Sequence, residues 1–167
     1  MIRKSIYTIF AASVLYFGFV YLVASGYLGK YEGPGTISSI KTPNEILDKR
    51  LKDQFDAKES IGITNEKIIL FGDLHVHTTY SSDAFLMSLP MLAGEGTHPP
   101  ADACDFARYC SSLDFWSNTD HAEDLTPQDW IEIKDTIRQC NEVSGEGPQD
   151  TIAFLGWEWT QEGGFGI

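Results

Sequence analysis

The sequence predicts an α/β domain built on parallel strands and preceded by one transmembrane helix. Near the N-terminus, the 25 residues from Ser5 to Gly29 are all uncharged and mostly apolar. From residue 68 onward, short apolar runs alternate with helical patterns in the order strand, helix, strand, helix, strand. Strands that are joined by crossover helices run parallel, with right-handed connections.

Composition limits the chain to one folded domain and an attached segment. Of its 167 residues 43% are hydrophobic, which is enough for a core. The 12 basic and 24 acidic residues give a net charge of -12. No acid occurs in the first 30 residues, which hold three of the basic residues, so the other 137 carry 9 basic and 24 acidic residues, or -15. Nucleic acid is therefore not an expected partner, since binding it requires clustered Lys and Arg.

Residues 1–29 are predicted to be a membrane anchor. A helix of 25 residues reaches about 37 Å at 1.5 Å per residue, more than the roughly 30 Å hydrocarbon core of a bilayer. Arg3 and Lys4 precede it and favour a cytoplasmic N-terminus, which places the domain in the periplasm or outside the cell. The small residues of Val23–Gly26 leave open a cleaved signal peptide and a secreted domain. We expect an uncleaved, single-pass anchor.

Residues 30–67 are predicted to be a linker with one short helix. Gly33-Pro34-Gly35 has loop composition, and Thr42 is expected to cap a helix that starts with Pro43. Apolar residues repeat along one face of this helix, so we expect that face to dock on the domain: Leu47, Leu51 and Phe55.

The domain, residues 68–167, is predicted to contain about three β/α units. Its expected strands are Ile68–Phe71, which has the composition of a strand buried on both faces, Leu113–Ser117 and Thr151–Trp157. A closed (β/α) barrel usually takes about 200–250 residues, so these units correspond to the N-terminal portion of one.

Two helices are expected between these strands. One has an apolar stripe of Ala103, Phe106, Ala107 and Cys110. The other starts at a Thr126 cap and continues through Trp130, Ile133 and Ile137. We expect the tryptophans near the strands to contribute to core and rim packing: Trp116, Trp157 and Trp159.

Three cysteines allow at most one disulfide. Cys104 and Cys110 lie six residues apart on the first expected helix, about 240° around its axis, so they are poorly placed to pair with each other. We expect Cys104, Cys110 and Cys140 to be buried thiols.

Metal-ligating residue types follow each expected strand. His75 and His77 are separated by one residue, so in extended backbone both side chains point to the same side and can bind one ion. Asp83, the Asp120-His121 pair and Glu158 come after the first, second and third strands respectively. The carboxyl ends of parallel strands share one rim, so these groups should converge. Imidazole and carboxylate together suit Zn, Mn or Fe.

Other polar residues have simpler interpretations. His98 precedes Pro99-Pro100 and is expected to be a solvated loop residue. Ser81 and Ser82 have no evident base partner, so a serine nucleophile is not expected. Asp120 taken alone is a residue type that commonly caps the start of the following segment.

The motifs resemble those of the PHP superfamily, the polymerase and histidinol phosphatase type of metal-dependent phosphoesterases. The similar segments are Asp73–Asp83, Thr119–His121 and Gly156–Glu158. Within that superfamily, Phe71–Ala84, Asp114–Glu123 and Phe154–Gln161 resemble an uncharacterised, often exported bacterial family, domain of unknown function 3604.

This resemblance implies a distorted (β/α)7 barrel that holds up to three divalent ions, Zn, Mn or Fe, and hydrolyses phosphoesters. His75 and His77 would hold the first metal and Glu158 would bridge two metals. Asp83 and His121 would contribute to a third, with Asp120 orienting His121 or serving as an alternate ligand. The resemblance implies catalytic roles for Glu158 and Asp120.

The superfamily also takes His and Asp ligands from later strands, whereas this sequence has no histidine after His121. We therefore expect a C-terminally truncated chain that holds part of a site, binds metal weakly and turns over little. The expected function of the intact protein is a membrane-anchored metal-dependent hydrolase of a small phosphorylated substrate. A non-catalytic exported metal-binding module and an amidohydrolase-type hydrolase, which also has His-x-His after its first strand, are the alternatives. The substrate and the oligomeric state are left open.

Overall fold

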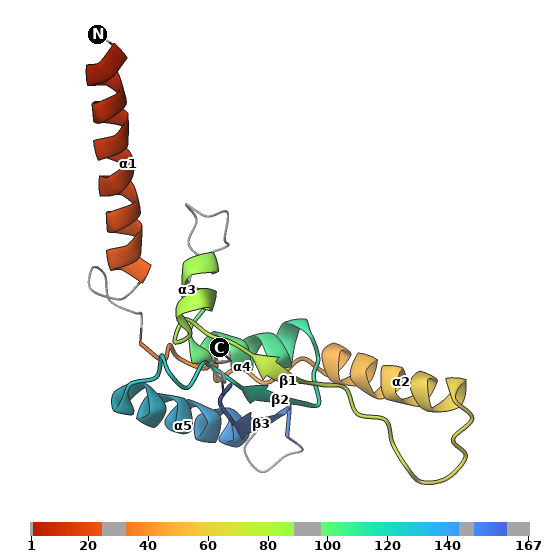
Figure 1. Cartoon of the computed structure of the whole chain (residues 1–167). Helices are drawn as coiled ribbons and strands as arrows, with labels where there is room; N and C mark the ends of the chain where they lie inside the picture. The colour runs from red at the N-terminus through yellow and green to blue at the C-terminus, as the bar shows by residue number, and fades with distance from the viewer. Residues whose placement is uncertain (1, 25–32, 89–97, 144–148, 160–167) are drawn as a thin grey trace, which may run out of the picture. The chain divides into compact units, whose positions relative to one another are not determined.

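The computed structural model describes residues 2–24, 33–88, 98–143 and 149–159 (Figure 1). The chain divides into two compact units, Met1–Glu32 and Gly33–Ile167.

The described part of the first unit, residues 2–24, is one helix, α1 (Ile2–Ala24). Its stretch Lys4–Leu22 is long and apolar enough to cross a membrane, and none of that stretch is buried against protein. An apolar helix of this kind has lipid as its natural surroundings. A helix that could span the membrane is thus present at the expected place. Its orientation and its retention in the mature protein stay predictions.

The second unit is built on a parallel sheet of three strands in the order β1-β2-β3 (Figure 1). The strands are β1 (Gly72–Val76), β2 (Phe115–Asn118) and β3 (Ile152–Leu155). The predicted α/β class and parallel strands are therefore confirmed. The closed barrel stays a prediction.

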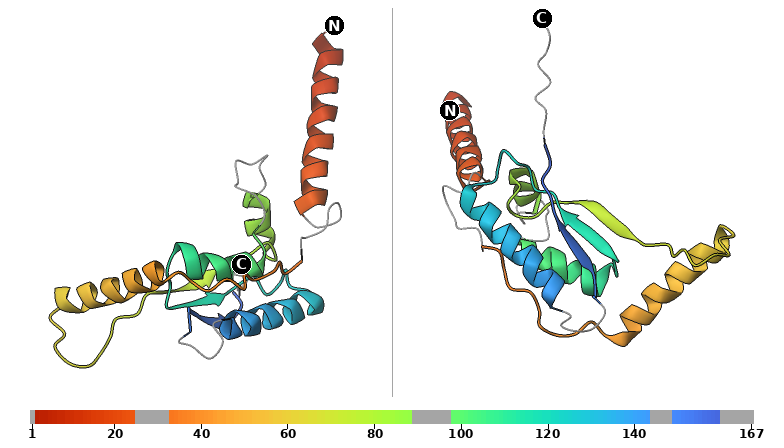
Figure 2. Two further views of the ribbon diagram at one scale, coloured as in Figure 1. Left: turned by 180° about the vertical axis from the view of Figure 1, so that it is seen from behind. Right: turned by 90° about the horizontal axis from the view of Figure 1, so that it is seen from below.

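Helices cover one face of this sheet (Figure 2). They are α4 (Pro100–Asp105), the π-helix η2 (Phe106–Cys110) and α5 (Pro127–Glu142). Thr126 caps α5 through a capping box, as predicted. The core lies between the helices and the sheet, and its buried members are Tyr80, Cys104, Ala107, Trp116, Ile133, Ile137, Cys140 and Ala153.

The opposite face of the sheet is exposed in the part of the chain that the structure describes. Leu74, Ile152 and Phe154 all have exposed side chains there. The prediction that the first strand is buried on both faces is therefore wrong. The strand also begins later than Ile68–Phe71, because pairing with β2 starts at Gly72. A Cβ on Gly72 would lie only 2.3 Å from the ring of Phe115, so any side chain here would displace that ring.

Helix α2 (Asn44–Ser60) is attached to the domain by polar contacts. Leu51 and Phe55 are exposed, so the predicted docking of its apolar face is wrong. Instead, Arg50 forms an ion pair with Asp114 at 3.3 Å, and the Gln54 side-chain amide donates to the same carboxylate at 2.6 Å.

Thr42 does not cap α2. Pro43 occupies the cap position, and no side chain caps the helix there. The Thr42 hydroxyl donates instead to the Asp150 carboxylate at 2.7 Å, a contact between residues 108 positions apart. Long-range pairing has therefore replaced the local cap that the sequence favours.

A buried arginine ties the expected linker to the domain. The Arg108 guanidinium pairs with Asp150 at 3.0 Å and donates to the backbone carbonyls of Ser38 and Ile40. Burial alone would raise the pKa of Asp150, but the hydrogen bonds from Thr42 and Arg108 outweigh it and hold that pKa below its ordinary value. The described part of the linker is thus anchored at residues 38–42.

The buried face of α4 and η2 differs from the apolar stripe predicted for this segment. Phe106 and Cys110 are exposed, whereas Cys104, Ala107 and Arg108 face the interior. Within η2 the Ser111 N–H donates to the Phe106 carbonyl at 3.0 Å, the five-residue spacing of a π-helix. The spacing of apolar residues did not predict this buried face, because Arg108 is charged and Cys104 lies outside the predicted stripe.

Two cysteines form a disulfide, so the prediction of three buried thiols is wrong. Cys104 on α4 is bonded to Cys140 on α5, and Cys110 is an exposed free thiol. Helix geometry correctly separates Cys104 from Cys110. It carries no information on how α4 packs against α5, and that packing decides the pairing.

The tryptophans behave differently from one another. Trp116 is fully buried, as predicted. Trp157 and Trp159 are 54% and 75% exposed, so neither lies in the core in the described part of the chain. Trp157 does contact the ring of Trp130 on α5, with the centroids 5.7 Å apart.

Replacing Arg108 with Ala is expected to lower the free energy of unfolding by about 3–5 kcal/mol, because it leaves the Asp150 carboxylate buried without its partner. Urea titration of the full chain in detergent measures this. Arg138→Ala, which breaks only exposed ion pairs on α5, is the control and should change stability far less. Because the folded pKa of Asp150 is lowered, the difference should be full above its unfolded value of 3.8 and shrink as the pH falls below it. Equal losses at all pH values would contradict this assignment.

Candidate metal centre

The carboxyl-terminal edge of the sheet gathers most of the predicted ligands. His75 lies within β1 and His77 directly after it. His121, beyond the end of β2, forms an isolated parallel bridge with Glu158, beyond the end of β3. The Glu158 N–H donates to the Asp120 carbonyl at 3.0 Å, and the Ala122 N–H donates to the Glu158 carbonyl at 2.9 Å. Parallel pairing therefore brings segments that are about 80 residues apart in sequence to one place.

Close approach of two backbones makes this pairing possible. A Cβ on Gly156 would lie 2.8 Å from the Ser117 hydroxyl and 2.9 Å from the Asn118 carbonyl. Only glycine allows the chain after β3 to run so close to the end of β2. This residue brings Glu158 beside the ligands of the neighbouring strands.

The first group of ligands consists of His75, His77 and Glu158. Glu158 Oε2 lies 3.2 Å from His75 Nε2 and 2.8 Å from His77 Nε2. The two imidazole rings are stacked, with centroids 4.9 Å apart and planes 14° from parallel. Their shared direction is the one predicted for His-x-His in an extended segment.

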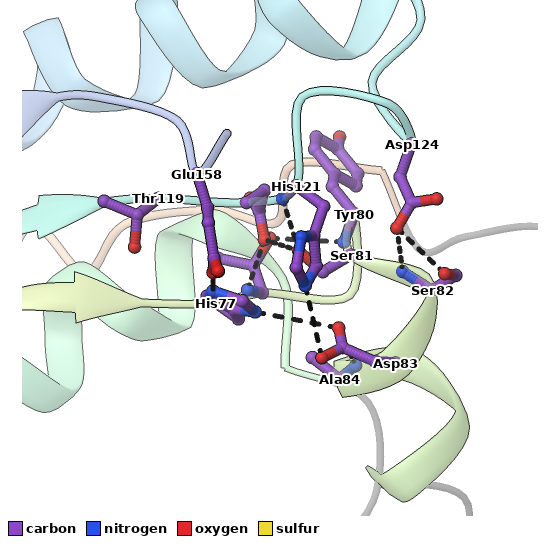
Figure 3. Close-up of polar contacts among 12 residues, drawn as sticks. His77, Tyr80, Ser81, Ser82, Asp83, Ala84, Thr119, His121, Asp124 and Glu158 are labelled. Atoms are coloured by element: carbon purple, nitrogen blue, oxygen red, sulfur yellow. Dashed lines mark hydrogen bonds and ion pairs between the residues drawn. The ribbon is translucent and has the colours of Figure 1, made fainter. Parts of the chain in front are cut away.

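The second group consists of His77, Asp83 and His121. Asp83 Oδ1 lies 3.6 Å from His77 Nδ1, and its Oδ2 lies 3.4 Å from His121 Nε2. Asp83 belongs to the first turn of α3 (Ser82–Ser88). Figure 3 shows that Asp83 and Glu158 approach the His77 ring from different sides.

The donor sets fit a divalent transition metal. Zinc binds histidine nitrogen at about 2.0–2.1 Å in tetrahedral geometry, so two of its ligand atoms lie roughly 3.4 Å apart. Three of the four contacts given above are between 3.2 and 3.6 Å. Two imidazoles and one carboxylate in each group are the donors that Zn, Mn and Fe accept.

His77 belongs to both groups, but through different nitrogens. Its Nε2 faces Glu158 and its Nδ1 faces Asp83. A neutral imidazole has a single ring nitrogen with a free lone pair, and the other nitrogen carries the proton. One nitrogen can therefore coordinate an ion while the other presents N–H to the carboxylate on its side, an arrangement that orients metal-bound histidines.

Asp83 is kept ionised. Partial burial alone would raise the pKa of this carboxyl, but the Ala84 N–H, which donates to it at 2.6 Å, and the nearby His121 and His77 outweigh burial and lower that pKa. Asp124 steadies the same turn, because its carboxylate accepts from both the N–H and the hydroxyl of Ser82 at 2.7 and 2.8 Å. A carboxylate held in its charged form is a competent metal ligand.

Asp120 does not face the other ligands. Its side chain is fully buried and accepts four hydrogen bonds, from the N–H and hydroxyl of Thr78, the hydroxyl of Ser81 and the amide of Asn118. These lie between 2.6 and 2.9 Å. The residue thus joins the segment after β1 to the end of β2. Its predicted catalytic role is not tested by this arrangement.

Thr78, Asn118 and Asp124 were not predicted from the sequence, and no role was expected for Ser81. The sequence contains one signal for them, the polar run from Thr78 to Ser82 directly after His-x-His. A polar run in this position is ordinarily an exposed loop. Thr78, Thr79 and Ser81 are instead buried. His98 is exposed, as predicted, and faces Asp102 at 3.8 Å outside both groups.

A cleft of about 770 Å³ lies beside β1 and reaches the first group, since His75 and His77 both line it. Its other walls include Phe106, Tyr109 and Leu113. Asp73, Asp102 and Asp105 also line it, and no Lys or Arg does so among the described residues. The centre therefore has acidic surroundings.

Residues 64–126 match the model of a family described as Protein of unknown function (DUF3604). That range contains every predicted ligand except Glu158, and it supports the family part of the resemblance. No curated protein and no solved structure matches the chain. The wider PHP superfamily assignment stays a prediction.

His77→Ala is expected to weaken Zn²⁺ binding to both groups, because both use this ring. His75→Ala should affect only the group with Glu158, and His121→Ala only the group with Asp83. Each affected group should lose at least about tenfold in affinity, measured by isothermal titration calorimetry on the full chain in detergent. His98→Ala is the matched control and should bind as the wild type does. Equal affinity in all four variants would remove the metal assignment.

Proposed function

We propose that the protein is a metal-dependent hydrolase, with its centre at the carboxyl-terminal edge of the sheet. The observation that carries the proposal is the convergence of three imidazoles and two carboxylates from five separate positions into two groups that share His77. A hydrophobic core does not need such a cluster, and the His75 side chain is 69% exposed. Ligand chemistry explains the cluster better than packing does.

Phosphoesters are the substrate class that we infer. A divalent ion bound at the centre would supply Lewis-acid polarisation of a phosphoryl oxygen and activation of a water molecule. The cleft beside β1 is lined by carboxylates and by no described Lys or Arg, so the side chains there do not neutralise a phosphate charge. The resemblance to the PHP superfamily points to the same class.

The side chains have distinct roles in this proposal. His75, His77 and Glu158 would hold one ion, and Asp83 and His121 would hold another, with His77 orienting toward one of the two at a time. Glu158 contacts both imidazoles of its group through one oxygen, which makes it the candidate catalytic carboxylate. Asp120 is fully buried, so in this proposal it acts by holding neighbouring residues rather than by touching substrate.

We also propose that the sheet is part of a distorted (β/α)7 barrel. The support is the exposed apolar face formed by Leu74, Ile152 and Phe154, together with helices that, among the described residues, pack on the other face. In a closed barrel, such a face becomes the packed interior.

The location that we propose is outside the cytoplasm, with α1 as an anchor. The Arg3–Lys4 pair before the apolar stretch supports a cytoplasmic N-terminus. The Cys104–Cys140 disulfide is independent support, since disulfides persist mainly in exported proteins.

Glu158→Gln is expected to reduce Mn²⁺-dependent hydrolysis of p-nitrophenyl phosphate or its bis ester by at least about 100-fold, with the fold retained by circular dichroism. Glu142→Gln on the exposed surface of α5 is the matched control. Intact wild-type protein that binds the metal with no turnover of either ester would favour a non-catalytic metal-binding module. Turnover that survives the substitution would refute the role of Glu158.

Export predicts a defined thiol count. In membranes isolated without reductant and denatured, a mass-tagged maleimide should modify one cysteine, Cys110, and after reduction it should modify three. Cys104→Ser should release Cys140 and give two modified thiols without reductant. Three modified thiols in unreduced wild type would contradict an oxidising location for the domain.

A further inference from the structure

The Ser81 hydroxyl is hydrogen-bonded to two residues that follow β2, Asp120 and His121. It donates to Asp120 Oδ1 at 2.9 Å and accepts from the backbone N–H of His121, also at 2.9 Å. Ser81 has no exposed surface. A hydroxyl with both its proton and a lone pair engaged by fixed partners has a defined orientation.

This hydroxyl connects the segments that carry the two outer ligands of the second group. On one side, the Ser81 carbonyl accepts from the Phe85 N–H at 2.9 Å, so Ser81 leads directly into α3 and Asp83. On the other side, the Ser81 hydroxyl accepts a hydrogen bond from the backbone N–H of His121. Asp83 and His121 face each other at 3.4 Å, a separation that depends on both segments (Figure 3).

The partner of Ser81 is itself immobilised. Asp120 accepts from the Thr78 N–H and hydroxyl and from the Asn118 amide, so its carboxylate has no freedom to follow a moving serine. A buried carboxylate with these partners is costly to rearrange, because any lost hydrogen bond leaves charge unpaired in the interior. The serine hydroxyl is thus set by the fold before any ligand arrives.

The first group is linked to this hydroxyl only indirectly, through the backbones of Asp120 and His121. Glu158 is held by backbone hydrogen bonds to Asp120 and Ala122, and these involve no atom of Ser81. His75 and His77 are placed by β1 and its extension. Loss of the serine hydroxyl should therefore act mainly on the second group.

We propose that Ser81 is a positioning residue for the second metal group, His77, Asp83 and His121. It sets the separation of Asp83 and His121 through its bonds to Asp120 and to the His121 backbone. It is not a nucleophile, because it is buried and its proton is directed at a buried carboxylate. This inference rests on the proposed metal centre and assigns Ser81 a role within it.

The test is Co²⁺ titration of the full chain in detergent, followed by visible absorption, with each group observed alone. His75→Ala leaves the second group, and His121→Ala leaves the first. Adding Ser81→Ala to His75→Ala should weaken the remaining Co²⁺ binding by about 10–100-fold. Adding it to His121→Ala should weaken the remaining binding by no more than a few-fold. Thr136→Val, which removes another buried hydroxyl, on α5 and away from both groups, is the control and should alter neither.

The outcomes separate this inference from the metal centre itself. Ser81→Thr, which keeps the hydroxyl, should retain the affinity and spectrum of the second group. Unchanged binding in the His75→Ala background, equal weakening of both groups, or unfolding by Ser81→Ala would each overturn the positioning role while leaving the metal centre standing. No Co²⁺ binding by the wild type would overturn both.

Discussion

A single buried carboxylate holds the ends of two strands together, and the candidate metal centre depends on it. Asp120 has no exposed surface, yet it carries four hydrogen bonds from the segments on either side. A charge in the interior is tolerated only when its partners are complete, so the geometry of these partners is strongly constrained. His77 and His121 lie immediately beside this constraint and gain their positions from it.

A second buried charge pair performs a comparable task at the other end of the domain. Arg108 and Asp150 join η2, the start of β3 and the segment at residues 38–42. Between these two polar anchors lies the small core around Trp116, which the Cys104–Cys140 disulfide reinforces. The modest sheet is therefore supported by directional interactions as much as by apolar burial, as expected for a core of this size.

The convergence of these ligand-type residues could be predicted from sequence because strand polarity decides it. Once residues 68–76, 113–121 and 151–158 are identified as parallel strands with their trailing ends, His77, His121 and Glu158 must share an edge. The distribution into two groups through opposite nitrogens of His77 could not be predicted, since it depends on ring orientation. The role of Asp120 toward Ser81 and Thr78 was hidden for a similar reason, because hydrogen bonds between segments 40 residues apart leave no periodic signal.

By itself the sequence determined the apolar N-terminal helix, the α/β class, the capping of α5 by Thr126 and the identity of the ligand-type residues. Each of these follows from local composition or from period, which neighbouring residues carry. Tertiary structure alone decided that Thr42 pairs with Asp150 instead of capping α2, that Cys104 bonds to Cys140, and which face of each element is covered. These outcomes depend on which surfaces meet in space, and the free energy of such contacts belongs to pairs of segments and to neither segment alone.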